Sequence, residues 1–127
     1  MEHNSKAEWR TIGDKEKYFR SNMEANYART LQFLKECGRI IEWEHEPETF
    51  YFEGIKRGTN NYKPDFKVIE SKEYHYWVEV KGYYDAKSIT KIKRFKKYFP
   101  NEKLILIDKR WFLRNNKQMK ALIKDWE

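Results

Sequence analysis

Two neighbouring segments with strand periodicity constrain the fold of this chain most. Residues 62–69 and 74–81 are rich in aromatic and β-branched side chains, and apolar and polar positions alternate along both. This pattern is typical of half-buried strands. The polar residues 70–73 between the two segments suit a turn. We therefore expect the two segments to form a β-hairpin.

Helical periodicity flanks this strand-rich region on both sides. Residues 14–37 place apolar side chains at helical spacing and stop at Gly38, and residues 85–99 repeat the pattern before Pro100. The remaining predicted elements are short strands at 40–44, 50–54 and 103–107 and a last helix at 115–126. This order predicts an α/β fold in which residues 1–127 form one domain and residues 1–13 form an N-terminal arm.

The charge and the cysteine content narrow the class of protein. A formal net charge of +7 and a sequence pI near 9.4 suit a nucleic acid or an anionic membrane surface as partner, although ordinary surface lysines give the same numbers. No apolar run approaches the ~18 residues of a membrane-spanning helix, and the N-terminus has no stretch like a signal peptide. Cys37 is the only cysteine, which favours a cytoplasmic setting and argues against a zinc finger.

Strand parity selects a group of candidate site residues. In residues 74–81 the expected core face consists of Tyr74, Tyr76, Val78 and Val80. Glu79 and Lys81 then lie together on the opposite face, because successive side chains of a strand point to opposite sides. On the preceding strand, Asp65 points away from the face of Phe66. If the two strands pair, Asp65 and Glu79 converge at one end of the hairpin.

Two carboxylates beside a lysine suit metal-dependent cleavage of a phosphodiester. Mg²⁺ and Mn²⁺ prefer oxygen ligands, which Asp65 and Glu79 supply and to which the Val80 carbonyl could add. A metal bound there would polarise a phosphate and lower the pKa of a bound water. Lys81 could orient that water or stabilise the charge that develops on the phosphate. The alternative is a surface Glu–Lys pair without a function.

The motif Pro64-Asp65, followed by Glu79-Val80-Lys81-Gly82, resembles that of the PD-(D/E)xK nuclease superfamily. The resemblance covers roughly residues 20–108. It implies a restriction-endonuclease-like core of helix, three-stranded meander, helix and strand, to which this chain adds a C-terminal helix. It also implies a Mg²⁺-dependent nuclease in which Asp65 and Glu79 bind the metal and Lys81 is catalytic. Many members place a glutamate of the first helix at the site, and Glu24 is the matching position.

Glu24 also stands out on its own physical pattern. It lies along the apolar stripe of its helix, at helical spacing from Tyr27, Ala28 and Leu31. One interpretation is a capping box, since Ser21 and Glu24 have the required spacing. The other is a place in the active site as a catalytic residue and further metal ligand. We favour the second, because helical composition begins before Ser21.

The helix at 85–99 carries a dense group of cations and directly follows the Glu-Val-Lys segment. Between Ala86 and Pro100 there is no acidic residue, and six are basic: Lys87, Lys91, Lys93, Arg94, Lys96 and Lys97. Such a face could neutralise backbone phosphates, although a solvated helix face is the simpler alternative. We expect DNA contacts from Lys87, Lys91, Lys93, Arg94 and Lys97. The resemblance implies that a residue of this helix supports the site, with Lys91 and Arg94 as candidates.

Two further patterns favour ordinary structural roles. Glu42, Glu44, Glu46 and Glu48 share one parity, and a solvated strand face is a simpler interpretation than a second ion site. His45 and His75 are single histidines, for which surface or packing roles are more common than metal ligation.

Within the superfamily, a chain this small resembles Holliday-junction-resolving enzymes and related phage endonucleases. The resemblance implies a homodimer that acts on branched DNA in recombination, in the cytoplasm of a bacterium or a phage-infected host, since two symmetric cuts suit a two-fold enzyme. Two alternatives stay open. One is a restriction-like or repair nuclease that acts on linear DNA or with a partner. The other is a nucleic-acid-binding module that does not cut.

Overall fold

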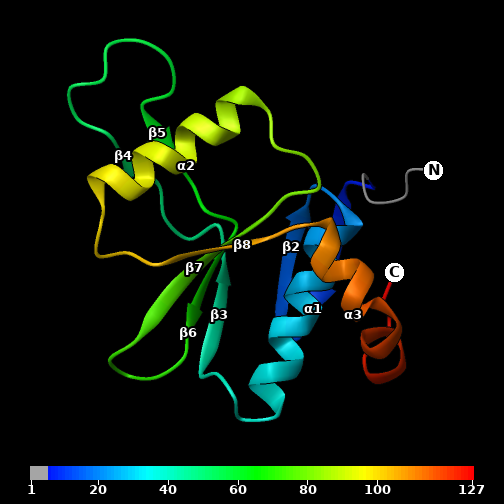
Figure 1. Cartoon of the computed structure of the whole chain (residues 1–127). Helices are drawn as coiled ribbons and strands as arrows, with labels where there is room; N and C mark the ends of the chain where they lie inside the picture. Colours follow the sequence, from blue (N-terminus) through cyan, green and yellow to red (C-terminus); the bar gives the residue numbers. More distant parts are fainter. Residues whose placement is uncertain (1–5) are drawn as a thin grey trace.

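A mixed four-stranded sheet forms the centre of the computed structural model, which describes residues 6–127. Its strands are β3 (Glu42–His45), β6 (Phe66–Ile69), β7 (His75–Val80) and β8 (Leu104–Ile107), in the spatial order β3-β6-β7-β8. The first three strands are antiparallel, whereas β8 runs parallel to β7. A parallel neighbour requires a crossover, which α2 (Ala86–Tyr98) supplies (Figure 1). The α/β class is therefore confirmed.

The predicted hairpin is present as β6 and β7, but the expected single strand at 62–69 was wrong, because Tyr62 belongs to β5 and β6 begins only at Phe66. Phe66 pairs with Val78, and Ile69 pairs with His75 at the turn end. The expected alternation holds for Tyr76, Val78 and Val80 but not for Tyr74, which precedes β7 and is exposed, and both faces of β7 are covered. Val78 and Val80 pack into a core under α1 (Asn22–Glu36), whereas Trp77 packs on the other side. Burial on both faces fixes the register, because a slip by one residue would exchange the two apolar sets.

The second core lies between the sheet and α2. The strands β4 (Phe50–Tyr51) and β5 (Asn61–Tyr62) pair with each other and close its outer side. Its buried members are mainly aromatic: Phe50, Phe52, Tyr62, Trp77 and Phe95. Their rings meet in edge-to-face contacts with centroids near 5 Å, such as Phe50 on Trp77 at 5.0 Å. This core holds α2 and the β4–β5 segment together above one end of the sheet.

The N-terminal prediction was wrong where the structure describes that segment. Residues 8–12 are the strand β1 (Glu8–Ile12) rather than an arm, and β2 (Lys15–Phe19) occupies the predicted start of the first helix. Gly13 makes the turn between them with φ +63°. The sequence shows little strand alternation here, because this hairpin is highly charged and buries only Arg10, Ile12 and Phe19. The rest of the predicted arm, residues 1–5, lies outside the described residues.

The last helix also differs from its predicted bounds. The helix α3 (Lys109–Leu122) begins directly after β8, where the Asp108 side chain accepts hydrogen bonds from the first backbone N–H groups. No α3 residue is fully buried, so the sequence of this helix has little apolar periodicity. The start of the helix could therefore not be predicted from such a pattern. Trp126 lies beyond the helix and donates from its ring to Asn116.

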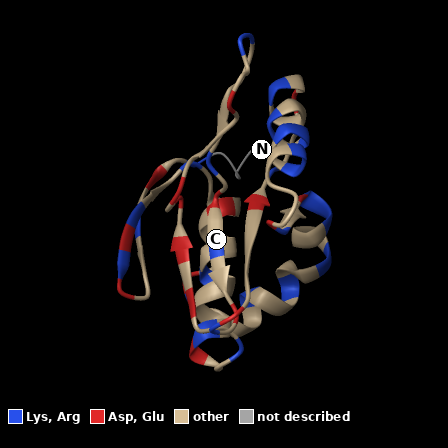
Figure 2. Ribbon diagram, turned by 90° about the vertical axis from the view of Figure 1, so that its left-hand side faces the viewer, with Lys and Arg blue, Asp and Glu red and all other residues tan. Residues whose placement is uncertain are grey.

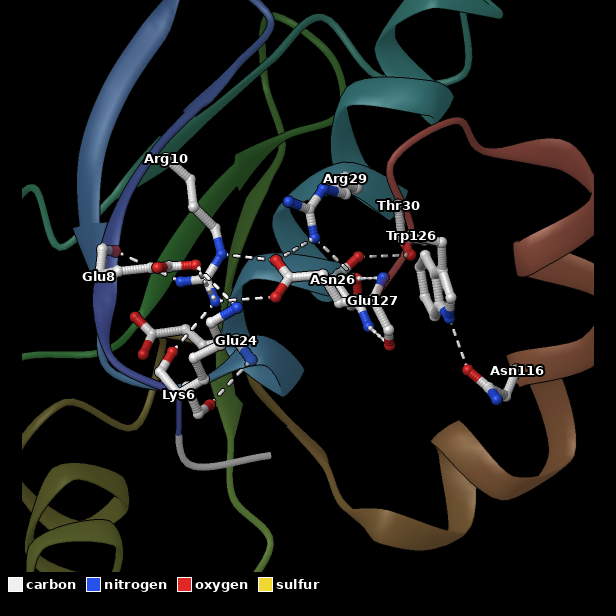
Figure 3. Close-up of polar contacts among 11 residues, drawn as sticks. Lys6, Glu8, Arg10, Glu24, Asn26, Arg29, Thr30, Asn116, Trp126 and Glu127 are labelled. Atoms are coloured by element: carbon white, nitrogen blue, oxygen red, sulfur yellow. Dashed lines mark hydrogen bonds and ion pairs between the residues drawn. The ribbon is translucent and has the colours of Figure 1, made fainter. Parts of the chain in front are cut away.

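The end of the described chain returns to the start of α1. Figure 3 shows the Glu127 carboxylate between Arg10 of β1 and Arg29 of α1, with N···O distances of 2.5 and 2.9 Å. The Asn26 side chain closes the contact by bonding the Glu127 backbone N–H and carbonyl. Partial burial opposes ionisation of Glu127, but the two guanidinium groups outweigh it and lower the carboxyl pKa. We call this group the Glu127 clamp; it fixes the segment of α1 that carries Glu24.

No helix in the described part of the chain combines the length and the apolar character needed to cross a membrane.

Candidate active site

Asp65 and Glu79 lie side by side at the open end of the β6–β7 hairpin. Asp65 directly precedes β6, so the register that pairs Phe66 with Val78 brings it opposite Glu79. The Asp65 carboxylate accepts a hydrogen bond of 2.7 Å from the backbone N–H of Val80. Both carboxylates are buried, with 8% and 6% of their surface exposed. The convergence predicted from strand parity is therefore present.

Glu24 reaches the same end of the sheet from the first turn of α1. Ser21 is the N-cap and accepts a hydrogen bond of 3.1 Å from the Glu24 backbone N–H. The expectation that the helix begins before Ser21 was wrong, and the capping interaction exists. It uses the Glu24 amide, however, and leaves the carboxylate free to accept from the Arg20 N–H at 3.2 Å and to bond His45 Nε2 at 2.5 Å. The two interpretations of Glu24 are therefore compatible.

One pocket collects the four predicted site residues. It measures about 440 Å³, and its lining includes Glu24, Asp65, Glu79 and Lys81, with Val80 between the last two. We call it the site pocket. An adjoining pocket shares Asp65, Glu79 and Lys81 and extends to Lys87 and Lys91 of α2. The predicted catalytic group therefore faces open space that continues onto the basic helix.

The electrostatics of the pocket are those of crowded, desolvated carboxylates. Burial raises the pKa of Asp65 well above its ordinary value, and the charges of Glu79 and Glu24 raise it further, while the Val80 N–H works in the opposite direction. Burial likewise raises the pKa of Glu79, against the hydrogen bond from Tyr62 and the charge of Lys81. Negative charges held this close favour a cation between them. The predicted ligands, which are the carboxylates of Asp65, Glu79 and Glu24 and the Val80 carbonyl, are all oxygen atoms and fit Mg²⁺ or Mn²⁺.

Tyr62 is a functional residue that the sequence pattern did not reveal. Its hydroxyl donates to Glu79 Oε1 at 2.6 Å from the end of β5. The ring packs in the aromatic core beneath, at 5.3 Å from Phe95. Burial and the Glu79 charge raise the Tyr62 pKa, so this hydroxyl remains a donor at neutral pH. It fixes one oxygen of Glu79 and leaves the second for other contacts.

His45 and Glu46 extend the acidic group beyond the predicted residues. With Glu24 they offer three ligand atoms within 4.8 Å of one another. Glu46 was wrongly assigned to a solvated strand face: β3 ends at His45, and φ +49° at Glu46 directs the chain so that its N–H donates to the Asp65 carbonyl at 2.8 Å. Its carboxylate pairs with Arg20. The histidine that precedes it is buried against Phe19.

Tyr84 carries a second hydroxyl on which the charges of Glu79 and Asp65 act. Its oxygen is buried, and it has no hydrogen-bond partner among the described residues. Burial raises the Tyr84 pKa to about 12, with further contributions from the charges of Glu79, Asp108 and Asp65. A buried hydroxyl without a partner is costly and uncommon. Tyr84 is not among the described residues that line the site pocket or the adjoining pocket, so a contact between its hydroxyl and a ligand stays a prediction.

The predicted DNA-binding residues of α2 divide into three sets. Lys87 and Lys91 border the pocket that holds Asp65, as expected for contacts near the site. Arg94 instead donates to the backbone carbonyls of Thr59 and Arg57, so part of its hydrogen-bonding capacity supports the β4–β5 loop. The others, Lys93 and Lys97, are exposed and border neither that pocket nor the site pocket. Contact of any of them with DNA stays a prediction.

Comparison with known proteins gives a family without a described activity. No curated protein and no solved structure matches the chain. A family model described as "Protein of unknown function (DUF1064)" matches residues 4–119, which include every candidate site residue. The chain therefore belongs to the DUF1064 family.

Proposed function

We propose that the protein is a metal-dependent endonuclease that hydrolyses phosphodiester bonds of DNA. One observation carries this proposal. Asp65 and Glu79 lie buried together beside Lys81 in a pocket that continues onto a helix rich in lysine and arginine. The order of α1, the meander β3-β6-β7, α2 and β8 supports it, because the PD-(D/E)xK resemblance implies this order for a nuclease core.

The chain's own residues suit the binding of Mg²⁺, with Mn²⁺ able to substitute. Asp65, Glu79 and the Val80 carbonyl would hold the ion, and Glu24 would add a further carboxylate. When bound, the metal would polarise the phosphate and acidify a water molecule. The Val80 N–H fixes Asp65, and the Tyr62 hydroxyl fixes Glu79, so both carboxylates are oriented before any ligand arrives.

Lys81 follows β7 and shares the pocket with both carboxylates. Its ammonium group can stabilise the additional negative charge of a phosphorane-like transition state and orient the attacking water. Arg20 borders the same pocket but pairs with Glu46. It therefore neutralises part of the acidic group and leaves Lys81 as the cation of the motif that faces the phosphate.

The narrower part of the proposal concerns the substrate and the assembly. The protein acts as a homodimer on branched DNA such as a Holliday junction, in the cytoplasm of a bacterium or a phage-infected cell. This part rests on the resemblance to small junction-resolving and phage endonucleases. The free, exposed Cys37 agrees with a reducing compartment.

The test compares a synthetic four-way junction with a linear duplex of the same sequences, in Mg²⁺, Mn²⁺ or EDTA. Preferential cutting of the junction by a dimer supports the whole proposal. Equal cutting of both substrates removes the junction selectivity and favours a restriction-like or repair nuclease. Binding without cutting in either metal removes the enzyme and leaves a nucleic-acid-binding module.

A further inference from the structure

A third pocket lies between α2 and the loop that joins β4 to β5. It measures about 760 Å³, and we call it the loop pocket. Four of its lining residues are cationic, namely Arg57, Lys87, Lys91 and Arg94, and four are neutral and polar, namely Thr59, Asn60, Asn61 and Thr90. None of the described residues that line it is acidic. A space surrounded by cations and neutral donors suits an anion.

The loop pocket is built by specific contacts rather than by chance proximity of surface side chains. Arg94 of α2 donates to the carbonyls of Thr59 and Arg57 and so ties the loop to the helix. Gly58 allows the turn there with φ +74°, and the Thr59 hydroxyl donates to the Asn61 carbonyl at 3.0 Å. These bonds hold the exposed Arg57 beside the lysines of α2.

The loop pocket is continuous with the candidate active site. Asn61, Lys87 and Lys91 border both the loop pocket and the pocket that holds Asp65 and Glu79. Figure 2 shows the Lys and Arg colour along α2 and at the tip of the β4–β5 loop, which project side by side from the sheet. A strand that enters the active site therefore has a cationic route beyond it.

The lysines of this route are crowded. Burial lowers the pKa of Lys91, and the neighbouring charges of Lys87 and Lys81 lower it further, against the opposite effect of Glu79. A bound phosphate would relieve this repulsion, because an anion stabilises the charged form of each lysine.

We propose that the loop pocket binds a backbone phosphate of the DNA strand that is cut, next to the phosphate at the active site. This inference rests on the proposed nuclease function for the identity of the strand. It assigns to Arg57 and the β4–β5 loop a binding role that the motif does not include. It also gives Arg94 a positioning role, since Arg94 holds the loop.

The first test measures binding of fluorescein-labelled DNA in Ca²⁺ by the wild type, Arg57→Gln and the control Lys72→Gln. Arg57 is exposed, so its replacement leaves the fold intact, and Lys72 is an exposed cation in the turn at the far end of the hairpin. Arg57→Gln should weaken binding roughly three- to tenfold, as expected for one charge-assisted contact. It should also lower the salt dependence by about one released counterion. Lys72→Gln should change affinity by about twofold or less.

The second test replaces one phosphate at a time with a neutral methylphosphonate near the cut position, which the products of cleavage define. One flanking substitution should weaken the wild type and have no additional effect in Arg57→Gln, because both changes remove the same contact. If the losses of affinity from Arg57→Gln and from the methylphosphonate were additive at every position, the proposed role of the loop pocket would be wrong. An equal loss of DNA affinity in Arg57→Gln and Lys72→Gln would also contradict the proposal.

The two tests separate this inference from the proposed function. If no DNA is cut, the contrast between Arg57→Gln and Lys72→Gln still decides whether the loop pocket binds a strand. If DNA is cut but Arg57→Gln and Lys72→Gln bind DNA equally well, the proposed nuclease activity is supported and the proposed role of the loop pocket is wrong. Inorganic phosphate that binds through Arg57, with DNA binding unchanged in Arg57→Gln, would assign the pocket to a free anion and overturn the proposal.

Discussion

The Asp65 carboxylate accepts a hydrogen bond of 2.7 Å from the backbone N–H of Val80, across the open end of the β6–β7 hairpin. This bond locks a side chain that precedes one strand to the main chain of the next. It leaves the carboxylate opposite Glu79, in the pocket that Lys81 also lines. The geometry of the acidic group is therefore set by strand register, and it costs free energy through burial of the Asp65 charge and through repulsion from Glu79 and Glu24, which a cation can relieve.

A divalent cation should stabilise the protein against heat. Mg²⁺ or Mn²⁺ at about a hundred times its dissociation constant should add roughly 2.7 kcal/mol to the free energy of unfolding, because it binds the folded site. Differential scanning fluorimetry measures the shift in Tm. The variant Asp65→Asn with Glu79→Gln should lose most of the shift. An equal shift in that variant would place the metal elsewhere.

Asp65→Asn should raise the stability of the metal-free protein at neutral pH. The pKa of Asp65 is raised by burial and by Glu79 and Glu24, so the folded state holds this proton more tightly than the unfolded chain. Stability linked to Asp65 is therefore full below its ordinary value of 3.8 and is lost as pH rises through the raised pKa. In EDTA, the Tm difference between variant and wild type should therefore increase as the pH rises from about 3.8 to the raised pKa of Asp65. A constant difference would contradict the assigned pKa direction.

Tyr62→Phe should cost stability and activity together. The change removes the hydroxyl that donates to buried Glu79 at 2.6 Å, which leaves an acceptor with one partner fewer. We expect a loss of roughly 1–3 kcal/mol in the free energy of unfolding. Cleavage should fall by about tenfold, the lower end for a residue that orients a metal ligand. Urea denaturation and single-turnover cleavage measure both effects, with the exposed Tyr98→Phe as control.

Tyr84→Phe makes the same chemical change with a different expected result. The Tyr84 hydroxyl is buried without a partner among the described residues, so its removal should leave stability unchanged or slightly higher. We expect a cleavage rate about tenfold lower, because a donor beside the carboxylates is lost to the bound substrate. Unchanged cleavage would assign Tyr84 to packing alone.

Glu127→Gln should destabilise the fold without replacing a residue that lines the site pocket. It removes the carboxylate charge between Arg10 and Arg29, at an expected cost of roughly 1.5–3 kcal/mol. Because the pKa of Glu127 is lowered, its contribution is present above its ordinary value of 4.5 and is lost as pH falls through the lowered value. The gap between wild type and variant in urea denaturation should therefore close in acid. A stability difference between wild type and variant that does not depend on pH would contradict the proposed role of the Glu127 carboxylate.

The parts of the site that the sequence predicted correctly depend on local periodicity. Alternation along β6 and β7 identified Asp65 and Glu79, since register follows from which face is apolar. The helical spacing around Glu24 revealed a carboxylate on an apolar stripe, and the structure directs it to the same pocket. Each of these inferences needed only neighbours within one element or one hairpin.

The parts that sequence patterns missed depend on distant contacts or on unusual backbone. Arg10 is buried because Glu127, 117 residues away, neutralises it, and no local pattern contains that information. Glu46 enters the site through a positive φ at the end of β3. Tyr62 resembles any apolar strand residue until its hydroxyl is seen to meet Glu79.

The most direct test of the central claim is cleavage of labelled DNA by the purified wild type and by Asp65→Asn, with binding measured in parallel. The account predicts products with Mg²⁺ or Mn²⁺, none in EDTA, and a loss of at least about a hundredfold in the variant, because a ligand matters at least as much as the groups that orient it. DNA binding should persist in the variant. Cleavage by Asp65→Asn at the wild-type rate, or no cleavage by the wild type with either metal, would contradict it.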